Sequence, residues 1–345
     1  MTVTTVGIDL AKNIFQIHGV DQHGKTILKK KLKRDQLFTF FANKEPCLIG
    51  MEACSGAHFW ARVLAAQGHR VKLMAPQFVK PYVKTNKNDA ADAEAICEAV
   101  TRPNMRFVGI PPPPEQQALL SLHRARSGLI KAQTAQINQV RGLLTEFGII
   151  MPIGKAAIKR YLPLILEDAD NGLPDTFRQV ISRLYEHLKE LGEHIEQYDY
   201  LLNEHFKHCE LSQRIASLPG IGLISATAIV GTIGDASEFK NGRQLSAWLG
   251  LVPRQHSSGG KNTLLGISKR GDSYLRTLLI HGARSVLIAR KNKVSSESWL
   301  GGLIHRRNTN VAAVALANKS ARTLWAMLTR GEDYNPNQYP DAFAS

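Results

Sequence analysis

The first third of the chain alternates short apolar runs with amphipathic segments. Residues 3–9 and 14–20 are apolar runs, residues 21–25 contain Gly24 and predict a turn, and residues 26–32 alternate apolar with basic side chains. These runs predict a meander of three antiparallel strands.

Helices and strands are then predicted in alternation. The pattern predicts helices at 35–42, at 57–67 before Gly68 and from Asp89 onward, and strands at 47–51 and 70–75. Antiparallel strands followed by strand–helix units are typical of a mixed sheet. We therefore expect an α/β fold for the N-terminal part of the chain.

The middle of the chain predicts long helices. Residues 111–114 are four consecutive prolines, which cannot continue a helix and mark a boundary. Residues 115–147 and 174–206 then carry apolar residues at helical spacing. In the second segment they recur every three or four positions, at Phe177, Ile181, Leu184, Leu188, Leu191, Ile195 and Tyr198. The pattern predicts a helical hairpin or an oligomerising coiled coil.

Most of the net positive charge of the chain lies in its C-terminal third. With 44 Lys and Arg against 29 Asp and Glu, the net charge is +15, and residues 208–330 carry +12 of it. The expected organisation is a sheet domain at 1–110, a helical region at 111–207, a mainly helical basic domain at 208–330 and a polar tail at 331–345.

The composition limits the function classes. A chain of 345 residues with 43% hydrophobic and 21% charged residues is globular rather than disordered. The excess positive charge favours a polyanionic partner such as nucleic acid, although an anionic membrane surface would also attract it. The longest uncharged stretch, residues 215–234, contains four Gly and one Pro, so we expect no membrane span. Asp9 interrupts any signal peptide, and we expect a cytoplasmic protein.

The four cysteines give no sign of a metal or disulfide framework. Cys47, Cys54, Cys97 and Cys209 form no Cys-x-x-Cys pair and have no paired His at zinc spacing. We expect free, buried thiols.

Four carboxylates fall at the ends of predicted elements. Asp9 ends the first strand, Glu52 ends the fourth, and Asp89 and Asp92 are three apart, on one face of a helix. If they converge, they can bind hard divalent cations, and two such ions stabilise the attacking and leaving oxygens of a phosphoryl transfer.

Each acid taken alone also has a structural explanation. Asp89 could cap the helix, Asp92 could be a first-turn carboxylate that the helix dipole favours, and Asp9 could be a turn residue. The joint pattern of strand Asp, strand Glu and helix Asp-x-x-Asp favours the catalytic interpretation.

These residues carry a family resemblance. Gly7-Ile8-Asp9-Leu10-Ala11-Lys12, Met51-Glu52-Ala53 and the segment at 87–93 resemble the RuvC-like Asp-Glu-Asp-Asp domain of a large bacterial insertion-sequence transposase family. The resemblance extends over residues 3 to about 330. It implies an RNase H-like fold at 1–110, catalysis with Mg²⁺ or Mn²⁺ at the four carboxylates, and nucleic-acid contacts by the neighbouring Lys12 and Lys87.

A glycine-rich turn predicts a second motif. Leu218-Pro219-Gly220-Ile221-Gly222 before an apolar helix resembles a helix-hairpin-helix, in which Gly220 and Gly222 would present backbone N–H groups to a DNA phosphate. An ordinary turn between packed helices explains the same sequence.

A serine pair in the basic region is the candidate nucleophile. By composition alone, the segment 254–261 is a solvated Ser-Gly loop. In the resembled family a Pro-Arg segment precedes a nucleophilic serine directly before glycine, which assigns the role to Ser258, with Ser257 as the alternative. Its expected phosphate-binding neighbours are Arg254, Lys261, Lys269, Arg270 and Arg276. His256 is either a proton acceptor or simply exposed.

The resulting hypothesis is a transposase that recombines DNA through a covalent serine–DNA intermediate. The family, and within it the branch called eleven-eleven, implies a homo-oligomer, dimer or tetramer, guided by a noncoding RNA and acting at the bacterial nucleoid. Two alternatives stay open. One is a metal-dependent nuclease resembling a Holliday-junction resolvase, with water as nucleophile, and the other is a non-catalytic DNA-binding protein.

Overall fold

The chain forms two compact units, Met1–Pro113 and Pro114–Ser345. The computed structural model describes residues 2–84, 88–105, 107–108, 113–258, 261–289 and 298–335, with the backbone alone at 257–258 and 261–262. The division between the units falls inside the run of four prolines.

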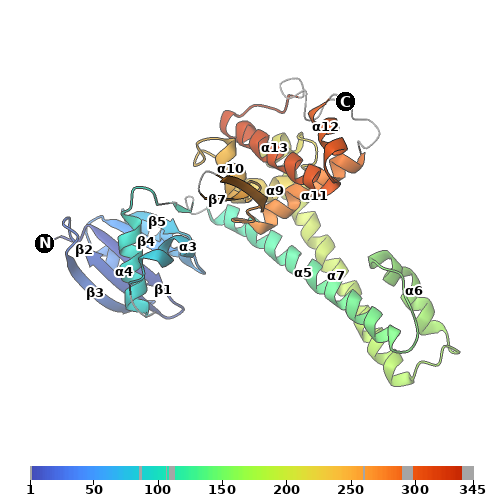
Figure 1. The fold of residues 1–345 in the computed structure, drawn as a ribbon. Helices are drawn as coiled ribbons and strands as arrows, with labels where there is room; N and C mark the ends of the chain where they lie inside the picture. Colours follow the sequence, from blue (N-terminus) through green and yellow to red (C-terminus); the bar gives the residue numbers. More distant parts are fainter. Residues whose placement is uncertain are drawn as a thin grey trace. The chain divides into compact units, whose positions relative to one another are not determined.

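The first unit is built on a six-stranded mixed sheet of order β3-β2-β1-β4-β5-β6 (Figure 1). Its strands are β1 (Thr5–Leu10), β2 (Ile14–Val20), β3 (Thr26–Lys33), β4 (Leu48–Glu52), β5 (Arg70–Met74) and β6 (Phe107–Val108). β1, β2 and β3 form the expected antiparallel meander, and β4 and β5 add parallel strands beside β1. The sheet is consistent with an RNase H-like domain. The sequence pattern missed β6, because two residues are too few to show a period.

Helices cover both faces of this sheet. Val6 and Ile8 of β1 are fully buried on the face that packs against α1 (Gln36–Ala42) and α2 (Ala57–Ala66). Since side chains alternate along a strand, Gly7 and Asp9 belong to the opposite face. The helix α4 (Asp89–Val100) lies across that face (Figure 1). The short α3 (Pro76–Val79) and a 3₁₀ turn (Lys80–Tyr82) come before it.

Two glycines of the sheet allow α4 to approach closely. A Cβ at Gly7 would lie 2.2 Å from the carbonyl oxygen of Ala93 and 2.4 Å from the amide nitrogen of Cys97. A Cβ at Gly50 would lie 2.7 Å from the Cβ of Val100. The backbone of α4 therefore rests directly on the backbone of β1, at a distance that no other residue at position 7 permits.

The second unit begins with a helical hairpin. α5 (Pro114–Thr145) and α7 (Asp175–Lys207) lie side by side over much of their length, and α6 (Lys155–Glu167), which was not predicted, packs beside their far end (Figure 1). The expected apolar positions of α7 pack against α5: Ile181 and Leu188 join a core with Val140 and Leu144. The hairpin is intramolecular, which is the first of the two arrangements expected from the sequence.

A group of shorter helices completes the second unit. They are α8 (Glu210–Ala216), α9 (Leu223–Ile233), α10 (Gly242–Trp248), α11 (Ser273–Ala289), α12 (Trp299–Arg306) and α13 (Thr309–Arg330). One hydrophobic core joins them all. No helix within the described ranges is long and apolar enough to cross a membrane.

A buried histidine connects the helical hairpin to this group. The ring of His123 on α5 is hydrogen-bonded to the hydroxyl of Thr227 on α9 at 3.1 Å and to that of Tyr274 on α11 at 3.1 Å. Only 2% of His123 is exposed. Burial, together with the positive charges of Arg126 and His205, lowers the pKa of His123 to about 4. The neutral ring is therefore the form that holds the three helices together.

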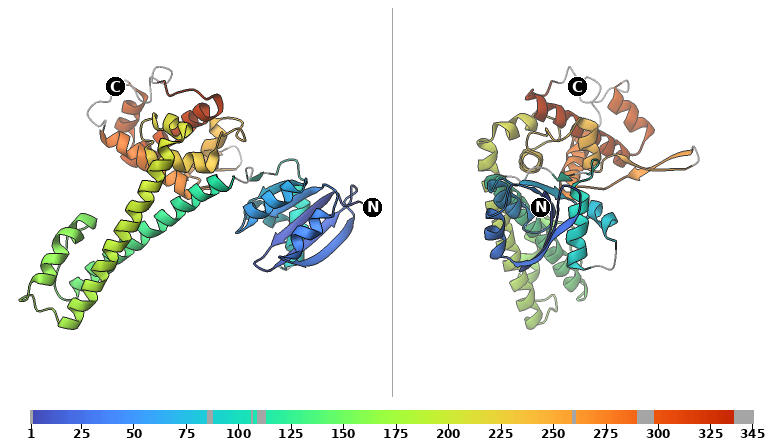
Figure 2. Two further views of the ribbon diagram at one scale, coloured as in Figure 1. Left: turned by 180° about the vertical axis from the view of Figure 1, so that it is seen from behind. Right: turned by 90° about the vertical axis from the view of Figure 1, so that its left-hand side faces the viewer.

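A β-hairpin interrupts the helical C-terminal region, where the sequence predicted a loop. β7 (Pro253–Ser258) and β8 (Lys261–Ile267) pair antiparallel and extend beyond the neighbouring helices (Figure 2, right). The loop prediction for 254–261 was wrong because strand pairing satisfies backbone groups that a solvated loop leaves to water. Gly259-Gly260 between two polar runs is the sequence signal that indicates a hairpin.

The cysteines are free, as expected, but only in part buried. Cys47 and Cys97 are buried, Cys54 is exposed and Cys209 is intermediate. Burial raises the pKa of both Cys47 and Cys97 to about 11, so these two thiols stay protonated and unreactive near neutral pH. The expectation of burial was wrong for Cys54, which is exposed two residues after the end of β4.

Replacing Gly7 with alanine tests the close packing of α4. The added methyl group would meet the backbone of α4, so we expect Gly7→Ala to lower the free energy of unfolding by about 2–3 kcal/mol. Gly142→Ala is the control, because nothing lies within 4 Å of its added Cβ on α5 and alanine favours a helix by about 1 kcal/mol. Urea denaturation compares the two. An unchanged stability of Gly7→Ala would contradict the contact.

Acid should weaken the second unit through His123. In the unfolded chain His123 takes up a proton near its ordinary pKa of 6.5, whereas the folded chain resists until about pH 4. Protons therefore favour unfolding as the pH falls through this window, by up to about 3 kcal/mol at its lower end. His123→Gln removes the titrating group. Urea denaturation at several pH values should show the wild type losing stability relative to His123→Gln below pH 6.5, and a constant difference would refute the assignment.

Candidate active site

Two of the four predicted carboxylates lie at one edge of the sheet. Asp9 is the fifth residue of β1, and Glu52 is the last residue of β4. β1 and β4 are parallel neighbours in which Ile8 is opposite Met51, so Asp9 and Glu52 come next in the same register. Because parallel strands end at the same edge, the sheet itself brings these two acids together.

The other two carboxylates come from the first turn of α4. The cap of this helix is Asn88, whose side chain accepts a hydrogen bond from the Ala91 amide at 2.8 Å. Asp89 and Asp92 are then its first and fourth helical residues. Asp89 is thus not the capping residue, and Asp9 lies within a strand rather than a turn. The structural explanations offered for Asp89 and Asp9 are therefore wrong, whereas Asp92 does lie in the first turn of α4, where the helix dipole favours a carboxylate.

Three of the four acids form a cluster. One carboxylate oxygen each from Asp9, Asp89 and Asp92 lies within 4.8 Å of the others. Asp9 and Asp92 are half-buried, while Asp89 is exposed. The close packing at Gly7 makes this possible, because Gly7 and Asp9 share the face of β1 that α4 covers.

Glu52 lies outside this cluster but close to the same edge. Burial raises the pKa of the Cys54 thiol, and the carboxylates of Glu52 and then Asp9 raise it further. Both acids therefore act on one thiol, two residues after Glu52. The sequence interpretation grouped Cys54 with the buried cysteines and missed its position beside the acids.

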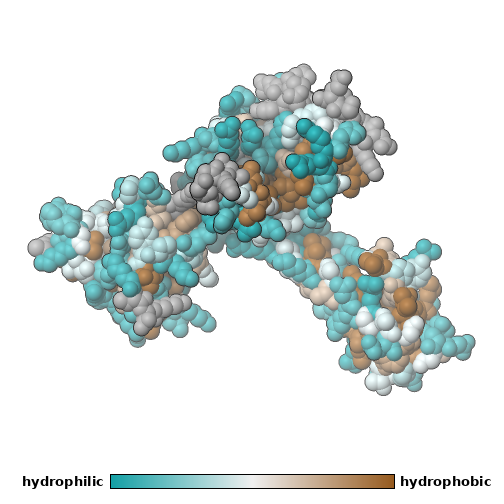
Figure 3. Space-filling view, viewed as in Figure 1, coloured by the Kyte–Doolittle hydropathy of each residue, from teal (hydrophilic) through white to brown (hydrophobic). Residues whose placement is uncertain are grey.

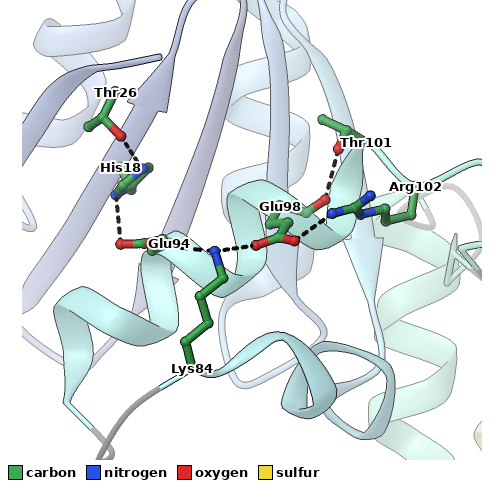
Figure 4. Close-up of polar contacts among 7 residues, drawn as sticks. All are labelled: His18, Thr26, Lys84, Glu94, Glu98, Thr101 and Arg102. Atoms are coloured by element: carbon green, nitrogen blue, oxygen red, sulfur yellow. Dashed lines mark hydrogen bonds and ion pairs between the residues drawn. The ribbon is translucent and has the colours of Figure 1, made fainter. Parts of the chain in front are cut away.

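A polar network surrounds the acidic residues further along α4 (Figure 4). Glu94 and Glu98 both pair with Lys84, at 3.7 and 2.8 Å, and Glu98 also pairs with Arg102. Glu94 lies 4.0 Å from Nδ1 of the buried His18, whose pKa is lowered because burial outweighs the attraction of Glu94. The network connects Lys84, ahead of α4, with the second and third turns of the helix.

The donor set suits a divalent cation. Carboxylate oxygens are the ligands that Mg²⁺ and Mn²⁺ prefer, and three of them converge from a strand and a helix. The helix N-terminus contributes partial positive charge, which lessens the repulsion between the acids.

The glycine-rich turn joins α8 to α9, and its two glycines differ in their surroundings. Gly220 has a φ of +88°, and a Cβ there would lie 2.8 Å from the carbonyl oxygen of Gly282 on α11. Gly222 is exposed at the start of α9, and nothing lies within 4 Å of its Cβ position. Gly220 therefore serves the packing of the turn on α11, and Gly222 is the glycine whose surroundings are open to a phosphate.

The predicted nucleophile is at the end of a strand. Ser258 is the last residue of β7 and pairs with Lys261, and Ser257 pairs with Asn262. The base of this hairpin is tightly packed, since a Cβ at Gly250 would lie 2.2 Å from the Arg270 carbonyl oxygen and one at Gly271 would lie 1.8 Å from that of Trp248.

The expected phosphate-binding residues have different surroundings. Arg254, Lys269 and Arg270 are exposed at the base of the hairpin, and Lys12 is exposed in the turn after β1. Arg276 is half-buried, and its Nη1 donates to the carbonyl oxygens of Leu249 at 3.0 Å and Arg270 at 3.1 Å. This nitrogen holds the hairpin base together. Lys87 lies outside the described residues, as does the side chain of Lys261.

Comparisons with known proteins give matches over both units. A family model described as "Transposase IS116/IS110/IS902 family" matches residues 212–299, and the model DEDD_Tnp_IS110, described as "Transposase", matches residues 6–149. A "Probable family 20 transposase" of Pseudomonas aeruginosa is 51% identical over 97% of this chain and 100% of its own length. The "Transposase for insertion sequence element IS1111A" of Coxiella burnetii is 46% identical over 96% of this chain and 91% of its own.

A third relative also matches nearly the full length of the chain. The "Transposase for insertion sequence element IS1328" of Yersinia enterocolitica is 46% identical over 95% of this chain and 98% of its own length. Matches of this extent define an enzyme that cleaves and rejoins DNA strands. The chain belongs to the IS110/IS116/IS902 family of insertion-sequence transposases. Membership favours the transposase hypothesis over both the junction nuclease and the non-catalytic DNA-binding protein.

Binding of a divalent cation alone tests the carboxylate cluster. Removing one ligand charge should weaken Mn²⁺ binding by about tenfold or more, so we expect this loss in Asp92→Asn. Asp175→Asn is the matched control, because Asp175 is also a first-turn acid, on α7, outside the cluster. Calorimetric titration measures both. Equal affinities of Asp92→Asn and the wild type would refute the cluster as a metal site.

Proposed function

We propose that this transposase cleaves DNA at the carboxylates and carries the cut strand on Ser258. The observation that carries the proposal is the convergence of Asp9, Asp89 and Asp92 in a member of this family. Together with Glu52, these residues would hold Mg²⁺, or Mn²⁺ in its place. When bound, the metal would neutralise phosphate charge and stabilise the attacking and leaving oxygens.

The serine step conserves the phosphodiester energy. The hydroxyl oxygen of Ser258 attacks phosphorus, a serine–phosphate bond forms, and the bond to the leaving deoxyribose oxygen breaks. The serine proton passes to a base, for which His256 is the proposed acceptor, and the leaving oxygen takes up a proton. His256 lies two residues before Ser258 on the same strand, β7. Attack by the hydroxyl of a second strand reverses these steps and rejoins DNA.

The basic surface supports DNA binding at the serine. Residues 208–330 carry 17 Lys and Arg against five Asp and Glu. We assign phosphate contacts to Lys12 and Lys87 beside the acids, to Lys261 and to the exposed Arg254, Lys269, Arg270 and Gly222. Arg276 would act with them through the hairpin base that it stabilises. Such contacts neutralise phosphates without reading bases.

The proposal extends to an oligomer and a guide RNA. Exchange of strands between duplexes needs more than one active site, so the acids of one subunit would act with the serine of another. Hydrophobic residues are exposed around the α6 end of the helical hairpin (Figure 3), among them Ile150 and Ile153 at 84% and 86% and Leu164 at 57%. Burial of this surface in a dimer or tetramer would remove it from water. The guide RNA follows from the family resemblance, and the site of action would be nucleoid DNA in the cytoplasm.

Replacing Ser258 tests the covalent step. We expect Ser258→Ala to abolish the covalent protein–DNA adduct and strand exchange, because the variant lacks the hydroxyl that forms the serine–phosphate bond in the proposed step. Ser257→Ala is the matched control and should retain both activities. The measurement is a denaturing gel of protein incubated with labelled element-end DNA and Mn²⁺, alongside a recombination assay.

The outcomes separate the possible mechanisms. If Ser258→Ala still cleaves DNA and rejoining is lost, water is the nucleophile, as in a resolvase. If Ser257→Ala loses the adduct and Ser258→Ala keeps it, the nucleophile is Ser257. Mn²⁺ binding should be normal in both variants, because neither serine belongs to the carboxylate cluster.

A further inference from the structure

The first unit has a groove that the proposed chemistry does not use. It has a volume of about 700 Å³ and lies between the start of β2, the end of β3, α1 and α2. We call it the Trp60 groove and define it by the residues that its function rests on: Ile14, Lys33, Arg34, Phe38, Phe59 and Trp60.

Large apolar side chains are exposed in the Trp60 groove. Phe38 is 54% exposed, Phe59 is 46% exposed and Ile14 is 40% exposed. They come from α1, α2 and β2, so the fold gathers them from three separate segments. A patch of this kind with polar residues at its rim marks a binding surface, since exposing it to water costs free energy.

The groove also contains a buried donor without a protein partner. Trp60 is 5% exposed, and its ring packs edge-on against Phe15 at 5.4 Å and Phe59 at 5.2 Å. Its indole Nε1 makes no hydrogen bond to any residue that the structure describes. A buried N–H group without an acceptor is costly, and a carbonyl or ring nitrogen of a bound base would satisfy it.

Two basic residues, Lys33 and Arg34, lie beside these aromatic rings. The guanidinium of Arg34 lies 5.4 Å from the centre of the Trp60 ring and 5.9 Å from that of Phe15, and Lys33 precedes it at the groove. Asp35 is the acidic residue of the lining, so the basic residues outnumber it by two to one. Exposed aromatic rings next to basic side chains are typical of proteins that bind single-stranded nucleic acid, in which bases stack and phosphates are neutralised.

The position of the groove points to DNA. Asn13 and Ile14 line it, three and four residues beyond the end of β1, the strand that carries Asp9. The groove and the carboxylates therefore share one end of the sheet, on opposite faces. A strand held at the carboxylates can pass around this end, and its bases can reach the rings only where they are unpaired.

We infer that the Trp60 groove stacks unpaired bases of the DNA strand that is cleaved at the carboxylates. The inference rests on the proposed function for the identity of that strand. Phe38 and Phe59 supply the stacking surfaces, Trp60 donates a hydrogen bond to a base, and Lys33 and Arg34 neutralise the adjoining phosphates.

Binding of defined oligonucleotides to the full chain tests the inference. The double variant Phe38→Leu/Phe59→Leu keeps apolar bulk and removes the aromatic faces, so it should bind a thymidine oligonucleotide of about 15 nucleotides at least about tenfold more weakly than wild type. Binding to a duplex of equal length should be unchanged. Tyr200→Leu is the control, because Tyr200 is a 63% exposed aromatic on α7. Fluorescence anisotropy in EDTA measures affinity without cleavage. Trp60→Phe should weaken single-strand binding by a smaller factor, since it removes only the donor.

Other results of these measurements would contradict the inference. Unchanged single-strand binding by the double variant would refute the inference, as would an equal loss for duplex. If only a uridine oligonucleotide depends on the two rings, the groove holds RNA and the DNA assignment fails. Asp92→Asn should bind the thymidine oligonucleotide as wild type does and lose cleavage, so failure of the groove and failure of the carboxylate site give different results.

Discussion

The closeness of α4 to β1 is the constraint on which the candidate site depends. A helix on a sheet is normally held away by the side chains between them. Here Gly7 has none, and the backbone of α4 comes within 2.2 Å of where a Cβ would be. This brings the first turn of α4 over the end of β1, where Asp89 and Asp92 meet Asp9. Further along the helix, Glu94 and Glu98 pair with Lys84, and Glu98 also pairs with Arg102.

The charge distribution complements this cluster. Carboxylates repel the phosphates on which they act, so a protein with such a site needs a separate source of attraction. The chain separates the two functions: the acids belong to the first unit, and +12 of the net +15 belongs to residues 208–330. The base of the β7–β8 hairpin is closely packed, because a Cβ at Gly250 or Gly271 would collide with a backbone carbonyl and Arg276 donates hydrogen bonds to two carbonyls there. In the proposed function, this base would help to position Ser258.

Much of the first unit could be predicted from the sequence because its elements have strong periodic patterns. The strands at Ile14–Val20 and Leu48–Glu52 and the start of α4 at Asp89 were expected within a residue. The elements that were missed are short, interrupted by proline, or polar. β6 has two residues, α6 contains Pro163, and the polar β7–β8 hairpin buries little, so its pairing rests on backbone hydrogen bonds that side-chain periodicity does not report.

The sequence by itself determined which residue types were present and on which elements they would fall: acids at strand and helix ends, a serine pair in a basic region and long amphipathic helices. It also carried the family resemblance. Tertiary structure alone decided which of these residues meet. Three acids converge while Glu52 stays outside, Gly220 packs on α11, and aromatic residues from three segments form the Trp60 groove. The physical reason is that such contacts depend on how closely backbones approach, a property of two segments together that neither shows alone.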